Sequence, residues 1–194
     1  AVEDGFHRVS ERLPEWASRA RSGWRWTGAE RPPFAAVPGP GEESVWDYPR
    51  PPRLEAVDRR VVVRLDGTPI AETHRPMRVL ETSHPPTYYL PREDVRDEHL
   101  LPAPGTSRCE WKGSATYWTV RSAGGRVEER VGWSYEEPFA DFAALRGYLS
   151  FYPSRLECFV DGARVLPQAG GFYGGWVTPD LVGPFKGEPG STGW

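Results

Sequence analysis

The chain has 194 residues, which is enough for one domain with a hydrophobic core. Its 24 basic and 27 acidic residues leave a formal net charge of -3, which gives no general electrostatic reason to bind nucleic acid or an anionic membrane. No apolar run approaches the roughly 18 residues that cross a bilayer, and the N-terminus lacks the apolar region of a signal peptide. We therefore expect a cytoplasmic protein with neither a membrane nor a nucleic acid as its partner.

The composition favours turns, extended segments and aromatic packing. Gly and Pro contribute 21 residues each, and nine Trp help to bring the aromatic fraction to 13%. Lysine is rare, since only Lys112 and Lys186 contribute to the 24 basic residues. Cys109 and Cys158 are far apart and the four His are scattered. We therefore expect no disulfide framework, no metal site and no cofactor.

Residues 1–44 are expected to form a short helix followed by an arm. Ser10 is a candidate N-cap and Gly23 a stop signal. Between them, apolar side chains recur with the spacing of one helix face at Leu13, Trp16, Ala17 and Ala20. The Pro/Gly-rich residues 31–41 show no periodicity, which indicates an arm laid over a surface.

Residues 45–166 have the pattern of a β-rich core. Residues 60–72 form a predicted hairpin around Asp66-Gly67, and Asp161-Gly162 marks a second turn. The helical spacing of residues 139–146 predicts a helix there. Further strands are expected at residues 78–81, 87–90, 115–120, 127–133, 156–160 and 164–166. We predict a mainly β fold, a compact and mostly antiparallel sheet domain with one or two short helices, extended by an N-terminal arm and by a tail over residues 167–194 that packs on the core.

The segment over residues 80–95 is the first candidate for a site. Glu81 precedes a Pro-Pro turn, and His84 and Tyr88 follow close by, so the turn can bring these side chains to a common rim. Glu with His or Tyr is a plausible acid–base group, because burial and neighbouring charges bring their pKa values towards neutrality. The alternative is a structural turn with a solvated histidine.

Residues 106–118 form the second candidate. Lys112 stands between Trp111 and Gly113, where its ammonium can hold an anionic group or, if desolvated, act as a base. The alternative is an exposed turn, and Cys109 is better explained by packing.

Trp133 and Tyr135 point to one side of a strand, as a pocket wall or as core. The glycine-rich tail near Lys186 either cradles a phosphate or, more simply, is held by ring packing.

Four motifs together resemble a bacterial family, the domain of unknown function 427 (DUF427), which is also catalogued as nucleotidyltransferase-like. They are Val45-Trp-Asp-Tyr-Pro-Arg-Pro-Pro52, Leu80-Glu-Thr-Ser-His-Pro-Pro-Thr-Tyr-Tyr-Leu-Pro-Arg-Glu-Asp-Val95, Cys109-Glu-Trp-Lys-Gly113 and Trp133-Ser-Tyr135. The resemblance spans roughly residues 45–166, and the tail is similar to an extension of some longer members. It implies a compact β-rich fold and no settled activity. The sequence has no Gly-Ser pair followed by the spaced carboxylates that hold two magnesium ions.

These observations lead to one functional hypothesis and two alternatives. The hypothesis is a small-molecule pocket in a metal-independent enzyme, with Glu81 as general acid or base and Lys112 or Arg92 neutralising an anionic group. Further ligand contacts are expected from His84, Tyr88, Trp111 and Tyr135. The first alternative is a non-catalytic module that binds a ligand or peptide. The second is an interaction protein whose arm and tail clasp a second copy in a homodimer.

Overall fold

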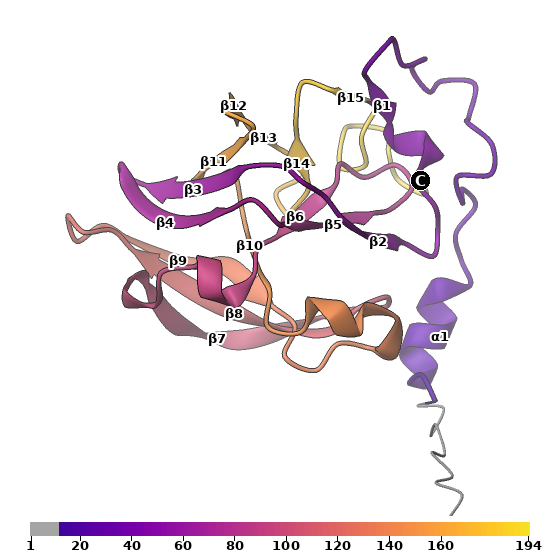
Figure 1. Ribbon diagram of the computed structural model, residues 1–194. Coiled ribbons are helices and arrows are strands. Elements are labelled where there is room, and N and C mark those ends of the chain that lie inside the picture. Colours follow the sequence, from indigo (N-terminus) through magenta and orange to yellow (C-terminus); the bar gives the residue numbers. More distant parts are fainter. Residues whose placement is uncertain (1–11) are drawn as a thin grey trace, which may run out of the picture.

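The computed structural model describes residues 12–194, and its strands lie in two layers (Figure 1). One layer is an antiparallel sheet with the order β10 (Leu149–Phe151), β9 (Val127–Ser134), β8 (Gly113–Arg121) and β7 (Leu100–Cys109). The other layer holds the sheet β12 (Ala163–Arg164), β11 (Glu157–Val160), β3 (Val61–Leu65) and β4 (Thr68–Thr73), and beside it the sheet β2 (Arg53–Ala56), β5 (Met77–Leu80) and β6 (Thr87–Tyr89). The predicted mainly β and mostly antiparallel fold is confirmed.

Both predicted Asp-Gly hairpins form. Asp66 and Gly67 have φ values of 53° and 72° between β3 and β4, and Asp161 and Gly162 have values of 49° and 82° between β11 and β12. Two successive residues with positive φ give a two-residue turn whose twist matches that of the strands, and Asp-Gly tolerates this conformation. Strand β11 of the second hairpin pairs with β3 of the first, so two distant parts of the chain share one sheet.

Strand β7 was not among the predicted strands. It contains Pro102 and Pro104, which cannot donate a backbone hydrogen bond and which weaken any strand pattern. The structure accommodates them because β7 lies at the edge of its sheet and because its register with β8 shifts between Ala103 and Thr106. An edge strand pairs on one side only, so prolines can face the unpaired side.

The helices are shorter than the sequence pattern predicts. The N-terminal helix is α1 (Glu15–Arg21), which begins after Pro14 without a side-chain cap, and the expected N-cap at Ser10 lies outside the described residues. A short helix forms at the predicted residues 139–146, but it is not an α-helix. It is the 3-10 helix η4 (Ala140–Leu145), interrupted at Phe142, where φ is -115°. Phe142 and Leu145 are both buried, and side chains three residues apart stack on one face of a 3-10 helix. The other 3-10 helices are η1 (Val45–Asp47), η2 (Arg92–Asp94) and η3 (Asp97–His99).

Two apolar clusters fill the space between the layers. The first contains residues of β3, β4, β8, β9, β10 and β11, together with Trp176 from the tail, which has no exposed surface. The second lies between β5 and β6 on one side and β8 and β9 on the other, and it includes Tyr89, Trp111, Trp133 and Tyr135. Within residues 12–194, no helix has the length and apolar character needed to cross a membrane.

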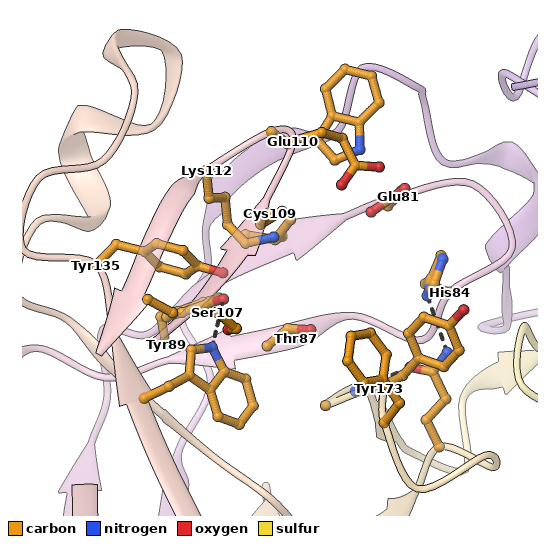
Figure 2. Close-up of a pocket in the computed structure, with 18 of the residues that line it drawn as sticks. Glu81, His84, Thr87, Tyr89, Ser107, Cys109, Glu110, Lys112, Tyr135 and Tyr173 are labelled. Carbon is orange, nitrogen blue, oxygen red and sulfur yellow. Dashed lines mark hydrogen bonds between the residues drawn. The ribbon is translucent and has the colours of Figure 1, made fainter. Parts of the chain in front are cut away.

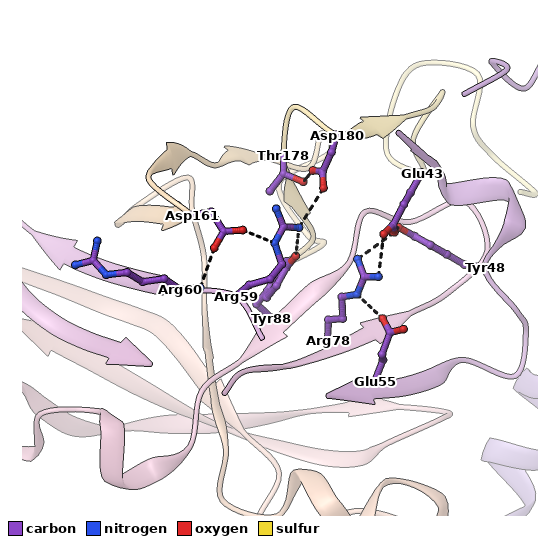
Figure 3. A network of polar contacts seen from close by, with 10 residues as sticks. All are labelled: Glu43, Tyr48, Glu55, Arg59, Arg60, Arg78, Tyr88, Asp161, Thr178 and Asp180. Atoms are coloured by element: carbon purple, nitrogen blue, oxygen red, sulfur yellow. Dashed lines mark hydrogen bonds and ion pairs between the residues drawn. The ribbon is translucent and has the colours of Figure 1, made fainter. Parts of the chain in front are cut away.

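The segment before β2 and the tail are tied to the sheets by short strands and by two arginines, of which Arg78 is buried and Arg59 is half-buried. The strand β1 (Glu43–Ser44) pairs in parallel with β15 (Leu181–Val182), and β13 (Leu166–Pro167) pairs with β14 (Trp176–Val177). Arg78 donates to both carboxylate oxygens of Glu43 at 3.0 Å and to Glu55, while Arg59 contacts Tyr88 and two aspartates (Figure 3). The tail is therefore held on the core by rings, strand pairs and charged hydrogen bonds.

Candidate functional site

A cavity of about 200 Å³ opens in the second apolar cluster. Its walls come from β5 and β6, from the turn between β7 and β8, and from β9. Two segments distant in sequence complete the lining. Trp24 follows α1, and residues 172–175 belong to the tail. The cavity is therefore a joint product of the sheet layers, the N-terminal arm and the tail.

Lys112 is the buried cation of this pocket. It lies in the turn between β7 and β8, is 9% exposed, and lines the cavity with its ammonium directed into it (Figure 2). Nζ lies 5.7 Å from the ring centre of Tyr135 and 6.0 Å from that of Phe142. Across residues 12–194, no hydrogen-bond acceptor or carboxylate is paired with this ammonium. The two aromatic faces are its main compensation for lost water.

The pKa of Lys112 keeps this group charged. Burial lowers the pKa, but electrostatic interactions with the acidic groups of Cys109, Tyr135, Tyr89 and Glu81 outweigh burial and raise the pKa well above its ordinary value. Burial also raises the pKa values of Tyr89 and Tyr135, so both phenols are neutral at pH 7. Lys112 is therefore suited to an electrostatic contact with an anion and not to the role of a neutral amine base.

Glu81 faces the same cavity from the end of β5, and a buried arginine holds it. Arg50 Nε lies 3.1 Å from Glu81 Oε1, and the side chains are 1% and 16% exposed respectively. Nη1 and Nη2 of Arg50 donate to the carbonyl oxygens of Trp26 and Thr82, each at 3.0 Å, and the guanidinium lies 4.0 Å from the ring centre of Trp24. The arginine is fixed on all sides, so it fixes the Glu81 carboxylate in turn.

His84 is neutral, and its tautomer follows from its neighbour. The amide of Gln168 accepts from Gly175 N at 3.1 Å through Oε1 and donates to the carbonyl oxygen of Lys186 at 2.7 Å through Nε2. This orientation places an NH₂ group 3.1 Å from His84 Nδ1, which must therefore accept, and the ring proton resides on Nε2. Burial, opposed by Glu81 and reinforced by nearby cations, lowers the pKa of His84 to about 4.

Aromatic groups with polar edges line the inner part of the pocket. The indole of Trp133 donates to the hydroxyl of Tyr89 at 3.2 Å, which leaves the Tyr89 proton available for a ligand. The Tyr135 hydroxyl lies beside the Lys112 ammonium in Figure 2. The indole N–H groups of Trp24 and Trp111, both from pocket residues, are buried and have no acceptor in the described part of the chain. Such unpaired donors favour a ligand rich in acceptors.

The tail closes one side of the pocket through close backbone contacts. A Cβ atom at Gly174 would lie 2.3 Å from the Trp133 ring, and one at Gly175 would lie 2.2 Å from Gln168 Oε1. Only glycine permits this approach, which places the adjacent Tyr173 ring 5.1 Å from the ring centre of His84. The glycines of the tail therefore build the pocket wall. Near the glycines considered as a phosphate cradle, the Nζ of Lys186 donates to Ser191 O at 2.9 Å and so holds the end of the tail.

The structure brings five of the seven candidate residues to this pocket, namely Glu81, His84, Trp111, Lys112 and Tyr135. Tyr88 was expected there and lies elsewhere. It points to the opposite face of β6 from Tyr89, into the first apolar cluster, because neighbouring residues of a strand alternate between faces. Arg92 also lies elsewhere. It begins η2, pairs with Asp97, and places its guanidinium 5.4 Å from the ring centre of Trp118.

Sequence reasoning missed several residues that shape the site, namely Trp24, Arg50, Glu110, Gln168 and Tyr173. Arg50 stands in a motif that carried the family resemblance, but nothing local shows that it meets Glu81 across 31 residues. Gln168 and Tyr173 belong to the glycine-rich tail, whose repeated glycines were the available signal for close backbone approach.

The family comparison agrees with the motifs. Residues 53–162, more than half of the chain, match the family described as Domain of unknown function (DUF427). The chain belongs to the DUF427 family. No curated protein matches it. The matched region includes Glu81, His84 and the whole β7–β8 turn, whereas Trp24, Arg50 and the tail residues of the pocket lie outside it. The pocket is therefore assembled from the DUF427 region and from both of its flanks.

Proposed function

We propose that this DUF427 protein binds a small organic anion with a planar or apolar portion, and that Lys112 is the anion contact. The supporting observation is the unpaired ammonium of Lys112 on the wall of a cavity, 9% exposed, with no acceptor among residues 12–194. Removing a cation from water costs several kcal/mol unless an opposite charge or good hydrogen bonds compensate. An anion in the cavity supplies that missing partner.

The other walls of the pocket determine which kind of body can carry the anionic group of the ligand. Tyr135 and Tyr89 present ring faces and hydroxyl groups beside the ammonium, and Trp111 and Trp133 contribute further apolar surface. Rings of this kind hold a flat or apolar body, while phenol and indole donors bind acceptor atoms. A carboxylate on an aromatic or short aliphatic body fits these requirements.

The test is ligand-induced stabilisation of the full chain, measured by thermal unfolding against small carboxylates such as benzoate and phenylacetate. A ligand that binds only the folded state at about 100 Kd adds roughly 2.7 kcal/mol to the free energy of unfolding. We expect such a shift to vanish in Lys112→Met. The control is Arg92→Met, which removes a cation outside the pocket and should retain the shift. A shift that survives Lys112→Met rejects the proposed anion contact.

Acid–base catalysis on the bound ligand is the second candidate function, supported by the Glu81–Arg50 pair. Arg50 holds a carboxylate in a fixed position on the same pocket wall, at 3.1 Å, with enough exposure for a ligand to reach it. His84 offers an Nε2–H donor nearby and no free acceptor at Nδ1, so Glu81 is the base of this arrangement. Glu81→Gln should keep ligand binding and abolish turnover. Recovery of the ligand unchanged from the wild-type protein, by mass spectrometry, favours binding alone.

A further inference from the structure

The charges of this pocket are separated. The cation, Lys112, lies deep among the rings, and two carboxylates, those of Glu81 and Glu110, lie on another side of the cavity (Figure 2). Burial lowers the pKa of Arg50, and both carboxylates oppose that shift. Burial raises the pKa of Tyr173, and the same two carboxylates raise it further. Glu81 and Glu110 therefore lie close enough to the same two groups, Arg50 and Tyr173, to influence both electrostatically.

The acidic side carries a net negative charge. Arg50 compensates Glu81, but each of its three nitrogens donates a hydrogen bond within the protein and its side chain is 1% exposed, so it is not open to a ligand. The carboxylate of Glu110 has no ion-pair or hydrogen-bond partner among the described residues. Arg108 also lines the pocket, but its guanidinium lies 5.7 Å from the ring of Trp16, on α1 and outside the cavity. The Lys112 ammonium, the Glu110 carboxylate and the second oxygen of Glu81 thus remain open to a ligand.

We propose that the pocket takes a zwitterion whose ammonium and carboxylate are separated by a planar or apolar body, an inference that rests on the proposed anion contact at Lys112. The carboxylate meets Lys112, and the ammonium meets Glu110 and the free oxygen of Glu81. The indole of Trp24, which lines the pocket over Arg50, and the ring of Tyr173 border the cationic end. Aromatic faces beside carboxylates are a favourable setting for an organic ammonium.

A matched set of three probes tests this assignment by isothermal titration calorimetry on the full chain. The probes are para-(aminomethyl)benzoate, para-methylbenzoate and para-methylbenzylamine, which share a ring and a length and differ in charge. We expect the zwitterion to bind about tenfold more tightly than the anion, because a charge-assisted hydrogen bond contributes roughly 1.5 kcal/mol or more. The cation alone should bind least, since it leaves Lys112 unpaired.

Two variants and a control test which protein group binds each charged end of the ligand. Glu110→Gln should reduce the affinity for the zwitterion to that for the anion and change the affinity for the anion by less than about threefold. Lys112→Met should abolish binding of both. Glu137→Gln removes an exposed carboxylate outside this cavity and should change neither.

The outcomes separate the two proposals. If para-methylbenzoate binds as tightly as the zwitterion, or if Glu110→Gln keeps the advantage of the zwitterion, the zwitterion assignment is overturned while the anion contact stands. If binding of both probes persists in Lys112→Met, the anion contact itself falls. Failure of all three probes to bind at millimolar concentration overturns the assignment of this ligand class.

Discussion

The two lysines of this chain are buried to nearly the same extent and have opposite surroundings. Lys112 is 9% exposed and Lys186 is 8% exposed. The ammonium of Lys186 donates to the carbonyl oxygen of Ser191 at 2.9 Å, which holds the end of the tail. The ammonium of Lys112 has no hydrogen-bond acceptor among the described residues and lies near the ring faces of Tyr135 and Phe142. A buried ammonium costs desolvation free energy that its contacts must offset, so methionine substitutions measure how well the surroundings of each lysine do so.

We predict that Lys112→Met changes the free energy of unfolding of the ligand-free protein by less than about 1 kcal/mol, because the desolvation cost of the ammonium and its favourable contacts with the neighbouring rings and acidic groups are lost together. Lys186→Met should instead destabilise it by about 1 kcal/mol, because a carbonyl oxygen loses its donor. Urea unfolding of both variants measures the free energies. A loss of several kcal/mol in Lys112→Met would show that the ammonium has a strong partner in the folded state and would contradict the anion-binding proposal.

His84 predicts a pH dependence of stability with a definite sign. Its pKa is about 4 in the folded protein and about 6.5 in an unfolded chain, so the unfolded state binds the proton first as pH falls. The contribution of His84 to the free energy of unfolding is fully present above about pH 6.5. It is lost as the pH falls towards 4, by about 2 kcal/mol between pH 7 and pH 5. The carboxyl pKa values of Glu43, Glu128 and Asp161 are lowered, so their contributions are lost only at more acidic pH.

The control for this prediction is His84→Gln, in which the slope between pH 7 and pH 5 should flatten. Proton NMR of the imidazole in the wild-type protein gives the folded-state value directly. A titration near pH 6.5 would mean that the imidazole is not desolvated in the folded protein, and the predicted loss of stability between pH 7 and pH 5 would then be wrong.

Sequence reasoning located part of the candidate site, because that part depends on local pattern. Glu81 and His84 flank one turn, and Trp111 and Lys112 share another, so short-range geometry brings each pair to a rim. Tyr88 was expected at the pocket but lies on the other face of β6. Adjacent strand residues point to opposite faces, and two neighbouring tyrosines do not reveal which of them faces the pocket. Arg50 and Gln168 were missed because their partners lie far away in sequence.

At the scale of elements, local turn chemistry predicted well and long-range pairing did not. The β3–β4 hairpin followed from Asp66-Gly67, whose left-handed backbone few other pairs adopt easily. The edge strand β7, with its two prolines, and the two-residue strands β1 and β15 have no signal in their own residues. They form because partner strands and packed rings supply the pairing, which a linear pattern does not encode.

Arg59 joins three elements, and its removal tests how the tail is held. It lies 2.7 Å from Asp161 and 3.1 Å from both Asp180 and the hydroxyl of Tyr88 (Figure 3). We predict that Arg59→Ala lowers the free energy of unfolding by about 1–3 kcal/mol, because a buried phenol and two carboxylates lose their donor. Arg60→Ala removes the neighbouring pair with Glu72, whose side chains are 48% and 49% exposed, and should cost less than about 1 kcal/mol. Equal losses in the two variants would show that the Arg59 contacts add no more than a surface pair.

At the scale of the whole molecule, the DUF427 region is not self-contained. The match covers residues 53–162, yet the first apolar cluster includes Trp176, and Trp46 lies fully buried in a third cluster that also contacts Trp194. The division of the chain at residues 44 and 166 stays a prediction about sequence segments. In the folded protein, both flanks supply core and pocket, so folding of the family region and formation of the site are coupled.

Trp176 gives the sharpest test of that coupling. Its ring has no exposed surface, lies 5.4 Å from that of Tyr88, and donates through Nε1 to the carbonyl oxygen of Phe151 at 3.0 Å. We predict that Trp176→Ala lowers the free energy of unfolding by about 3–5 kcal/mol, as expected for a large core side chain. Phe172→Ala, in the same tail but 74% exposed, should change it by less than about 0.5 kcal/mol. Urea denaturation compares the two variants. A small loss in Trp176→Ala would mean that residues 53–162 fold without the tail, and the pocket would then be an addition to a finished domain.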